Sequence, residues 1–523
     1  MKRPAEAPEV AAKRHCTDMP CKEMEAASLD EAFDMLVEKF ASRPAVEDDV
    51  KTCWTYRELQ EASFRIAAGM LANIGQGADP PIVALLLPRT CAWLAACVAT
   101  IRVGTLLALS CDLCSEDEVL RNQEAIAEHR PRLLVLGKGV SAPSAGVPLA
   151  YVEDLLMTKA PFEQRRFRHL DDTLYLVYTG GTTAASKCVV QTHRMALHEL
   201  RAYEDFGVMN CEDRILHHTS AFWGATCLGL FDLPWSCGAC LVLVSQHGVS
   251  EVARAINERQ ITVAGLVPSL LDALDEKKCR SLRTVFTWGE PLRPSTIDAW
   301  RSRVQLLDLL IASEYWLVLC ADHRRSGGFR PVREARLTLL QAEDTAYREV
   351  PREVPPGEVG ELYIAGPMVS AIGYVKTSLN EGAFVELPVG AEGSPVRHYR
   401  TRDLARFRAD GTLEYCGRAD GFAKVGGKWL DLAAVERSLQ SAGCREASLL
   451  WDEKAKVRHA CVVPESSQPL AALATKLQEW RKALELTEEL DAKRLEIDVI
   501  SYNSAITACE RAQTWEPWPL VIV

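Results

Sequence analysis

The chain has 523 residues, which is enough for two to four domains with ample hydrophobic core. Its formal net charge of −11, from 60 basic and 71 acidic residues, gives no sign of a surface dedicated to nucleic acid or membrane lipid. No apolar run approaches the ~20 residues of a membrane span and no secretory signal is recognisable, so we expect a cytoplasmic protein.

The 18 cysteines are scattered, and most of them read as small buried hydrophobes in a reducing compartment. Cys111 and Cys114 form one Cys-x-x-Cys pair, but no second pair or histidine pair follows at the spacing of a zinc site. A redox role for this pair stays open as the less favoured alternative.

Residues 1–27 are dominated by Pro, Ala, Glu and Lys without periodicity, which predicts a disordered tail. Two basic pairs, Lys2-Arg3 and Lys13-Arg14, have the form of a bipartite nuclear signal, but a solvated tail is the favoured interpretation.

From Ser28 onward the pattern becomes regular. Helical spacing predicts helices over 29–40, with Ser28 as N-cap, and over 54–71, 92–103 and 116–129. Apolar runs predict strands over 82–87, 105–109 and 132–136. Strands that alternate with helices indicate a layered α/β sheet with parallel strands, on which ligands bind beyond the carboxyl ends of the strands.

A polar loop follows a short buried strand predicted over 173–178. Its two glycines let backbone N–H groups crowd an anion, its hydroxyls add donors, and Lys187 ends it with a compact positive charge. It is not a Walker loop, because no glycine directly precedes the lysine. Taken alone, a polar surface turn is the better interpretation.

This loop resembles the phosphate loop of the adenylate-forming, AMP-binding superfamily, which includes acyl-CoA synthetases, luciferases and the adenylation domains of peptide synthetases. The family pattern is Tyr-Thr-Ser-Gly-Thr-Thr-Gly-x-Pro-Lys-Gly, and the matching residues are Tyr178, Thr179, Gly181, Thr182, Thr183 and Lys187. The loop departs from the pattern at Gly180, Ala184, Ser186 and Cys188. The resemblance implies that the matching hydroxyls, Gly181 and the lysine hold ATP, that Lys187 is catalytic, and that Thr183 lies near Mg²⁺.

Two later segments resemble the adenine and metal segments of the same family. Gly289 and Glu290 stand in a match to the Gly-Gly-Glu segment near the adenine. Residues 308–314 lie where the family has Asn-x-Tyr-Gly-x-Thr-Glu, so that Ser313 is implied to contact the nucleotide and Glu314 to hold Mg²⁺ as a catalytic group. Within this segment Leu310 replaces the adenine-stacking tyrosine, which keeps apolar contact and loses the aromatic face, and Ile311 replaces a glycine.

The clearest matches lie towards the C-terminus. Residues 357–374 fit the family's hairpin region throughout. Asp403 matches the carboxylate that accepts both ribose hydroxyls, although Arg402 stands where the family has glycine. Arg418 is implied to reach the nucleotide, next to the hinge at Asp420. Lys424 opens the segment 424–429, which matches the catalytic loop of the second half-reaction.

The end of the chain departs from the family. No Pro-x-Thr-x-x-Gly-Lys motif occurs, so the second lysine, which stabilises charge on the transferring phosphate, has no counterpart. Residues 471–523 resemble about one unit of a pentatricopeptide repeat, a helical hairpin whose arrays bind RNA. We favour a fusion or truncation scar and expect no RNA partner.

The substrate pocket is implied to lack one carboxylate. In members that activate amino acids, an aspartate follows a phenylalanine and binds the substrate ammonium; here Trp223 follows Phe222. This weakens an α-amino acid as substrate and leaves a small carboxylic acid, while Trp223 as plain core is an equally good interpretation.

We therefore predict an α/β fold of four parts: a disordered tail (1–27), a large AMP-binding domain of layered α/β sheets (28–416), a truncated α+β lid (417–470) and a helical-hairpin tail (471–523). The predicted function is ATP- and Mg²⁺-dependent formation of acyl-AMP, followed by transfer to a thiol of CoA or of a carrier protein's phosphopantetheine. The alternative is a catalytically weakened relative that only binds nucleotide.

Overall fold

The computed structural model describes most of the chain from residue 26 to residue 464. The described ranges are 26–75, 79–111, 116–141, 143, 146–163, 169–179, 187–220, 231–245, 248–289, 292–325, 328–341, 352–388, 394–419, 422–425, 428–431, 444–452 and 457–464. They fall into two compact units, the first comprising residues up to 337 with 363–400, and the second 338–362 with the residues from 401 onward.

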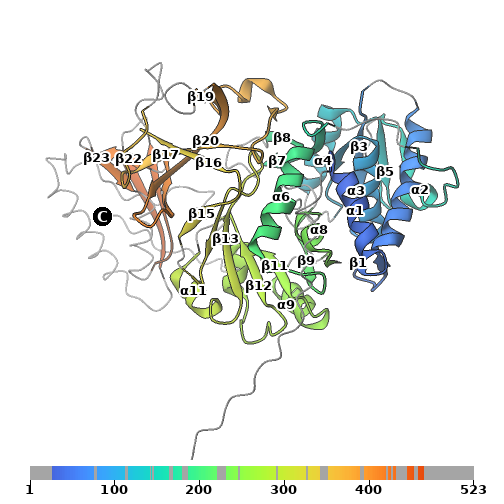
Figure 1. Cartoon of the computed structure of the whole chain (residues 1–523), viewed down its shortest axis with the longest axis horizontal. Helices are drawn as coiled ribbons and strands as arrows, with labels where there is room; N and C mark the ends of the chain where they lie inside the picture. Colours follow the sequence, from blue (N-terminus) through green and yellow to red (C-terminus); the bar gives the residue numbers. More distant parts are fainter. Residues whose placement is uncertain are drawn as a thin grey trace, which may run out of the picture. The chain divides into compact units, whose positions relative to one another are not determined.

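Three helices near the N-terminus confirm the predicted ones. α1 (Leu29–Phe40) begins where the Ser28 side chain accepts the N–H of Glu31, and α2 (Tyr56–Ile74) begins with a capping box between Thr55 and Glu58. In α3 (Cys91–Val103) every residue except Ala92 is buried, because this helix packs against α2 on one side and strands on another. Figure 1 shows these helices together in blue.

A seven-stranded sheet of the first unit carries the polar loop. The strand order is β18-β8-β7-β4-β3-β5-β6. The bounds are β3 (Ile82–Leu86), β4 (Thr105–Ala108), β5 (Leu133–Leu136), β6 (Leu149–Tyr151), β7 (Thr173–Thr179), β8 (Lys187–Thr192) and β18 (Gly373–Tyr374), with α4 (Glu116–His129) and α5 (Val152–Leu155) between strands. The strands β3 to β7 are parallel, as predicted, whereas β8 pairs antiparallel with β7 and the edge strand β18 pairs antiparallel with β8.

A second sheet runs through the first unit in the order β15-β14-β13-β12-β11-β9-β10-β1-β2. Its bounds are β1 (Pro44–Glu47), β2 (Cys53–Thr55), β9 (Arg214–His217), β10 (Cys240–Leu243), β11 (Val263–Leu266), β12 (Thr284–Thr287), β13 (Gln305–Leu310), β14 (Leu319–Asp322) and β15 (Phe329–Pro331). A separate edge is formed by β19 (Phe384–Pro388), after the short helix η3 (Thr377–Leu379).

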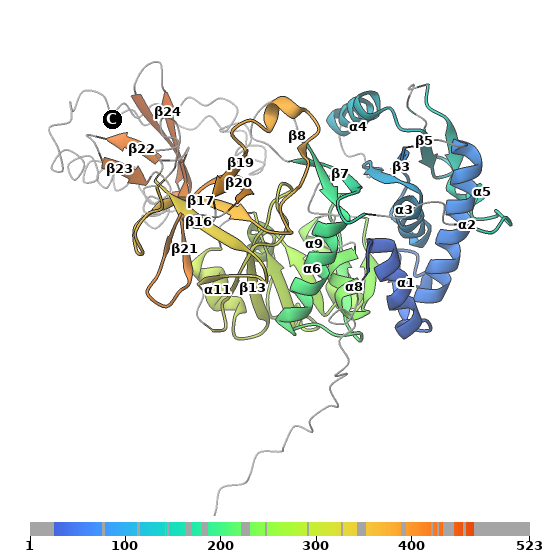
Figure 2. The same cartoon turned by 45° about the horizontal axis from the view of Figure 1, so that its top comes forward.

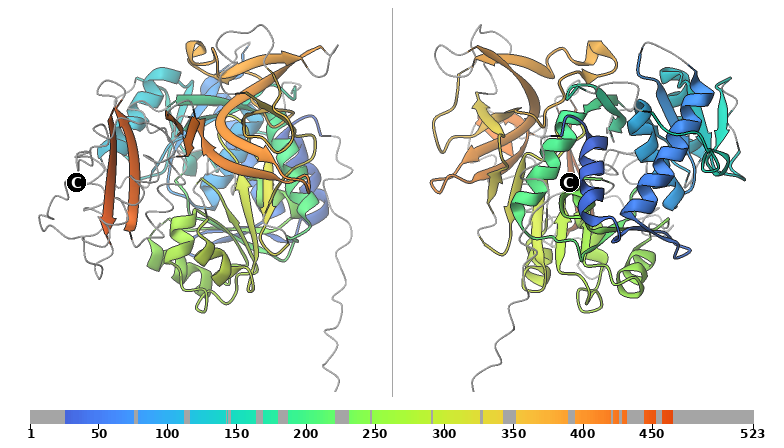
Figure 3. Two further views of the ribbon diagram at one scale, coloured as in Figure 1. Left: turned by 90° about the vertical axis from the view of Figure 1, so that its left-hand side faces the viewer. Right: turned by 45° about the vertical axis from the view of Figure 1, so that its right-hand side comes forward.

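One long helix precedes β9 of this second sheet, and four shorter helices lie in the connections between its strands. They are α6 (His193–Phe206), α8 (Leu233–Cys237), α9 (Val249–Glu258), α10 (Pro268–Ala273) and α11 (Pro294–Trp300). Residues of α9, α10 and α11 pack with those of β11, β12 and β13 in one buried apolar cluster. In the right-hand view of Figure 3, α6 in green lies beside α1 in blue, and the two helices are in contact.

The second unit consists of strands in the described residues. β16 (Arg336–Leu340), β17 (Gly360–Ala365), β20 (Pro395–Phe407) and β21 (Leu413–Arg418) contribute their residues 338–340, 360–362, 401–407 and 413–418. Two hairpins follow, β22 (Phe422–Val425) with β23 (Lys428–Asp431), and β24 (Cys444–Asp452) with β25 (Val457–Pro464), the latter drawn as the long red-orange pair on the left of Figure 3.

The α/β fold class is confirmed. Of the predicted tail 1–27, the structure describes only residues 26 and 27. The helical hairpin predicted over 471–523 lies outside the described residues, and so does Cys114, the second cysteine of the Cys-x-x-Cys pair. The predicted domain boundaries stay predictions. No helix in the described ranges is both long and apolar enough to cross a bilayer.

Candidate functional site

The two ends of the polar loop are held together by a hairpin. Thr179 at the end of β7 and Lys187 at the start of β8 are paired positions of an antiparallel ladder, and Figure 2 shows the two strands as neighbours. The loop residues Gly181, Thr182 and Thr183 lie outside the described residues. Whatever path the loop takes, it therefore starts and finishes at one place on the sheet.

The strand that leads into the loop is anchored from the side by α4. The Tyr178 hydroxyl donates to Glu128 Oε2 at 2.8 Å and lies 2.9 Å from His129 Nε2. Burial, and then the nearby Cys188 and Glu128, raise the pKa of Tyr178 well above its ordinary value, so this hydroxyl remains a neutral donor at physiological pH. These contacts fix the position of Thr179.

Ser313 and Glu314 follow β13 and are tied to the loop hairpin through their backbone. Gln191 on β8 donates from Nε2 to the Ser313 carbonyl at 3.2 Å. The Glu314 carbonyl accepts the N–H of Ser370 at 3.0 Å, and the Ser370 hydroxyl in turn donates to the Val190 carbonyl of β8. The segment predicted to hold the metal thus lies beside the strand that begins with Lys187.

Tyr374 joins the two side chains that the sequence analysis had assigned to phosphate and metal. Its hydroxyl donates to Glu314 Oε1 at 2.6 Å, and the Lys187 ammonium lies 5.6 Å from the centroid of its ring. The Tyr399 hydroxyl lies 3.4 Å from that of Tyr374. Burial and the Glu314 charge raise the pKa of Tyr374 far above its ordinary value, so the hydroxyl is a donor towards the carboxylate.

Among the residues assigned to the adenine side, the structure describes some and leaves out Glu290. Gly289 lies two positions beyond β12, with φ of 83°, and Glu290 lies outside the described residues. Leu310 is half-buried as the last residue of β13, next to the half-buried Ile311. Leu310 therefore ends the strand at the position where the family pattern has its stacking tyrosine.

In the second unit, the two positions assigned to the nucleoside are neighbours across two paired strands. Asp403 on β20 and Arg418 on β21 are paired positions of an antiparallel ladder. Asp403 is only 6% exposed, its backbone N–H donates to the Thr401 hydroxyl at 2.9 Å, and that hydroxyl donates to the Leu362 carbonyl at 2.8 Å. This brace orients the backbone from which the carboxylate projects.

Lys424 lies on β22, paired with Trp429 of β23. The glycines between these two strands, the hinge residue Asp420, and the substrate-side residues Phe222 and Trp223 all lie outside the described residues. Their assigned roles stay predictions.

Among the described residues, the Glu314 carboxylate offers an oxygen ligand of the kind that Mg²⁺ prefers. Mg²⁺ is usually bound by one or two carboxylates together with phosphate oxygens and waters. The Tyr374 hydrogen bond engages Oε1 of Glu314, and no described residue pairs with Oε2, so the residue fits a metal that is shared with a triphosphate. Within the same ranges no group of three or more His, Cys, Asp or Glu side chains forms a closed metal site.

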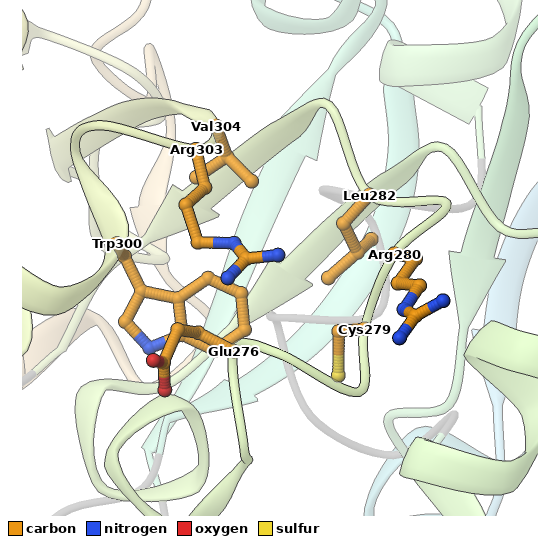
Figure 4. Close-up of a pocket in the computed structure, with 7 residues that line it drawn as sticks. All are labelled: Glu276, Cys279, Arg280, Leu282, Trp300, Arg303 and Val304. Carbon is orange, nitrogen blue, oxygen red and sulfur yellow. The ribbon is translucent and has the colours of Figure 1, made fainter.

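Two cavities of the first unit lie apart from this cluster. One, of about 280 Å³, is shown in Figure 4 and is lined by Glu276, Cys279, Arg280, Leu282, Trp300, Arg303 and Val304. Another, of about 530 Å³, lies among Arg194, Arg336 and Arg397, with Asp171 and Glu334 also at its wall. Neither is lined by Lys187, Glu314 or Tyr374, so neither is the site that the assigned residues form.

The sequence indicates no role for Tyr374 or Gln191. Tyr374 belongs to the matched segment 357–374, and Gln191 belongs to no recognised motif. The one available signal was the Gly373-Tyr374 pair inside that segment. No sequence pattern indicated that this tyrosine meets a glutamate sixty positions earlier, because that contact depends on how β18 pairs with β8.

Comparison with known proteins gives a consistent result. A family model described as AMP-binding enzyme matches residues 33–375. Among curated proteins, the chain is 30% identical over 457 residues to a plipastatin synthase of Bacillus subtilis, covering 81% of this chain and 12% of that protein. It is 28% identical over 406 residues to a dimodular nonribosomal peptide synthase of the same organism, covering 75% of this chain and 17% of that protein.

The chain spans only 6 to 20% of the length of the curated relatives considered, which are much larger proteins. Two solved structures share its fold. Klebsiella oxytoca NpsA in complex with 3-hydroxyanthranilyl-AMSN superposes with a TM-score of 0.73 at 20% identity, over 87% of this chain and 93% of that one. The O-succinylbenzoate coenzyme A synthetase MenE of Bacillus subtilis, in complex with AMP, superposes with a TM-score of 0.70 at 22% identity, over 86% and 91%.

Proposed function

The chain belongs to the family of AMP-binding enzymes, and from that premise we propose that it activates a carboxylic acid as an acyl adenylate. A carboxylate oxygen attacks the α-phosphorus of ATP, a new P–O bond forms, and the bond to the β-phosphate oxygen breaks. Pyrophosphate leaves with the bonding electron pair, and the acid is left as acyl-AMP. The observation that carries the proposal is the convergence of Lys187 and Glu314, from two distant segments, on Tyr374.

Each assigned residue has a physical task in this reaction. Lys187, with Thr179, Gly181, Thr182 and Thr183 of the loop, holds the phosphates through charge and hydrogen-bond donors. Glu314 and Thr183 hold Mg²⁺, which neutralises charge on the phosphate oxygens when it is bound. The remaining work of the protein is positioning, because phosphoryl-type transfer asks little covalent chemistry of the enzyme.

The nucleoside is assigned to a second set of residues. Asp403 accepts the two ribose hydroxyls, which suits a carboxylate with two acceptor oxygens, and Arg418 reaches the nucleotide. Because Asp403 is buried, a hydrogen bond that a ribose hydroxyl donates to its carboxylate is stronger than it would be in water. Gly289 and Glu290 are assigned to the adenine side, and Ser313 is assigned to a contact with the nucleotide.

A second half-reaction belongs to the same proposal. A thiol attacks the acyl carbonyl, a thioester forms, and AMP leaves with the electron pair of the broken C–O bond. Lys424, at the start of the matched segment 424–429, is the residue assigned to this step. The curated relative named as a dimodular nonribosomal peptide synthase supports a carrier-protein thiol as acceptor, and the structure neighbour named as a coenzyme A synthetase supports CoA.

A non-catalytic nucleotide-binding protein is the competing candidate. It is favoured by Leu310 and Ile311 in the adenine segment and by the missing C-terminal lysine motif. Acid-dependent exchange of radiolabelled pyrophosphate into ATP separates the two candidates. We expect exchange with at least one acid of a panel of aromatic, aliphatic and amino acids, and its loss in Lys187→Ala. Nucleotide binding without exchange for any acid would leave the binding protein as the correct candidate.

A further inference from the structure

Tyr374 occupies a position between two opposite charges. Its hydroxyl is 2.6 Å from Glu314 Oε1, while its ring faces the Lys187 ammonium at 5.6 Å. Both charged side chains are only half-buried, and among the described residues no ion pair joins them directly. One aromatic side chain therefore binds the carboxylate with its polar end and the cation with its face.

The backbone around Tyr374 fixes this placement. Tyr374 lies on the two-residue strand β18, opposite Val189 of β8, and its N–H donates to Asn380 Oδ1 at 2.7 Å. Gly373 has φ of 87°, and a Cβ there would collide with Asn380 Oδ1 and with Phe384. The ring itself packs edge-on against Phe384, with centroids 5.8 Å apart. Such a constrained side chain loses little entropy when it orients a neighbour.

The contacts with Tyr374 leave Glu314 able to bind a cation and Lys187 able to bind phosphate. Oε2 of Glu314 has no partner among the described residues, so it is the oxygen available to a divalent cation. Among the residues that the structure describes, the Lys187 ammonium contacts the Tyr374 ring face and no anion, so its three donors remain available to phosphate. A direct ion pair between the two would neutralise both groups and remove both functions.

We propose that Tyr374 is a positioning residue that orients Glu314 towards a nucleotide-bound divalent cation and keeps Lys187 from pairing with it. This rests on the proposed function for its ligand, Mg²⁺–ATP, and assigns a task to a residue that is itself expected to touch neither phosphate nor metal. It separates into two parts, since the hydroxyl acts on Glu314 and the ring acts on Lys187.

The test measures binding without turnover. Mn²⁺ is titrated by electron paramagnetic resonance into the full chain with α,β-methylene-ATP, and the same nucleotide is titrated by calorimetry in EDTA. Tyr374→Phe, which keeps the ring, should weaken Mn²⁺ binding in the ternary complex about tenfold, as expected for a lost hydrogen bond to a charged group, and leave binding in EDTA unchanged. Tyr399→Phe removes the neighbouring hydroxyl, 3.4 Å from that of Tyr374, and should change Mn²⁺ binding less than about twofold.

The ring is tested by removing it. Tyr374→Leu should weaken nucleotide binding in EDTA as well, because Lys187 becomes free to pair with Glu314. Adding Glu314→Gln to Tyr374→Leu removes that competing carboxylate and should restore binding in EDTA. Such a rescue would not follow from a general loss of packing, and thermal unfolding of each variant checks that the first unit remains folded.

Several results would overturn the inference. Unchanged Mn²⁺ affinity in Tyr374→Phe, an equal loss in Tyr399→Phe, or no rescue by Glu314→Gln would each do so. A wild-type chain that binds no Mn²⁺ with the nucleotide would also do so, because Glu314 would then have no cation to meet. If the wild type catalyses acid-dependent exchange and Tyr374→Phe binds Mn²⁺ with wild-type affinity, only this inference fails. If the predicted binding pattern is found but no acid supports exchange, only the catalytic proposal fails.

Discussion

Arg402 occupies a left-handed backbone conformation, with φ of 61°. The family pattern that this segment resembles has glycine at the same position, which adopts such a φ without steric cost. An L-residue with a Cβ costs about 1–2 kcal/mol there. The side chain is exposed, whereas the adjacent Asp403 is buried. The strain therefore lies beside the carboxylate assigned to the ribose, and it explains in physical terms why the family uses glycine.

Arg402→Gly should stabilise the chain. The relief of strain exceeds the extra unfolded-state entropy of glycine, about 0.5–1 kcal/mol, so a net gain of up to ~1 kcal/mol is expected. Arg402→Ala is the matched control, because it removes the same charge and keeps the Cβ. Urea unfolding of the three proteins decides the matter: a gain of the same size in Arg402→Ala would show that charge rather than backbone strain is responsible.

Asp403→Ala should weaken binding of AMP or ATP about tenfold or more. Two ribose hydroxyls lose their acceptor in a closed site, and each unpaired polar group there costs ~1–3 kcal/mol, against ~1.4 kcal/mol for each factor of ten. Calorimetric titration measures this directly, with Glu358→Ala as a control for loss of an exposed carboxylate in the same unit. Equal affinity in wild type and Asp403→Ala would remove the ribose assignment.

The helix α6 carries a buried carboxyl group, that of Glu199, to which no role in binding or catalysis is assigned. Glu199 on α6 and Asp232 just before α8 are each 1% exposed, and Tyr203 lies beside Glu199. Burial raises the pKa of Glu199 to about 8, and burial together with the Glu199 charge raises the pKa of Asp232 well above its ordinary value. The pair is therefore accommodated mainly in its protonated form.

This pair makes stability depend on pH in a definite direction. Because the folded-state pKa of Glu199 is above its unfolded value of about 4.5, the folded protein binds more protons, and stability falls as pH rises from about 4.5 to about 8. Glu199→Gln removes the cost of ionisation, so its advantage over wild type in unfolding free energy should be larger near pH 8 than near pH 5, by something on the order of 3 kcal/mol.

The exposed Glu38 on α1 supplies the control for that measurement, since Glu38→Gln changes a solvated carboxylate. A pH-dependent gain of the same size in Glu38→Gln would show that burial of Glu199 is not its cause. A difference between Glu199→Gln and wild type that stays the same near pH 5 and near pH 8 would contradict the assignment of a raised pKa to Glu199.

The sequence predicts an element well when the residues that stabilise it lie within the element itself. The bounds of α1 and α4 match the prediction, because periodicity, and for α1 the Ser28 cap, lie within the helix itself. β8 was not predicted, because the strand Lys187–Thr192 exists through its pairing with β7 and β18. The Tyr374–Glu314 contact was out of reach for the same reason, although both residues lay in segments that matched the family.

The absence of the second lysine motif is expected to slow the two half-reactions unequally. The segment 424–429 for thioester formation is well matched, and its first two residues, Lys424 and Val425, end the strand β22. The glycine-loop lysine for adenylation has no counterpart in the sequence, and Lys476, Lys482 and Lys493 stand in no such loop. The loss of one preorganised transition-state donor typically costs ~10²–10³ in rate.

Adenylation by this chain should therefore be about 10²–10³-fold slower than in an intact relative, whereas thioester formation should be less affected. Single-turnover kinetics started from acid plus ATP, and separately from synthetic acyl-AMP plus thiol, measure the two halves. Rates from both starting points at the level of an intact synthetase would show that the missing lysine is not needed.

If a carboxylate oxygen bonds to the α-phosphorus of ATP, one oxygen atom of the acid is transferred to AMP. An acid that supports pyrophosphate exchange is labelled with ¹⁸O in its carboxylate and incubated with ATP, Mg²⁺, a thiol and the full chain. Mass spectrometry of the released AMP should find one ¹⁸O atom, because the bridging oxygen of acyl-AMP stays with phosphorus when the thiol attacks the carbonyl. AMP that carries no label from the acid would contradict the account and would leave ATP hydrolysis as the reaction.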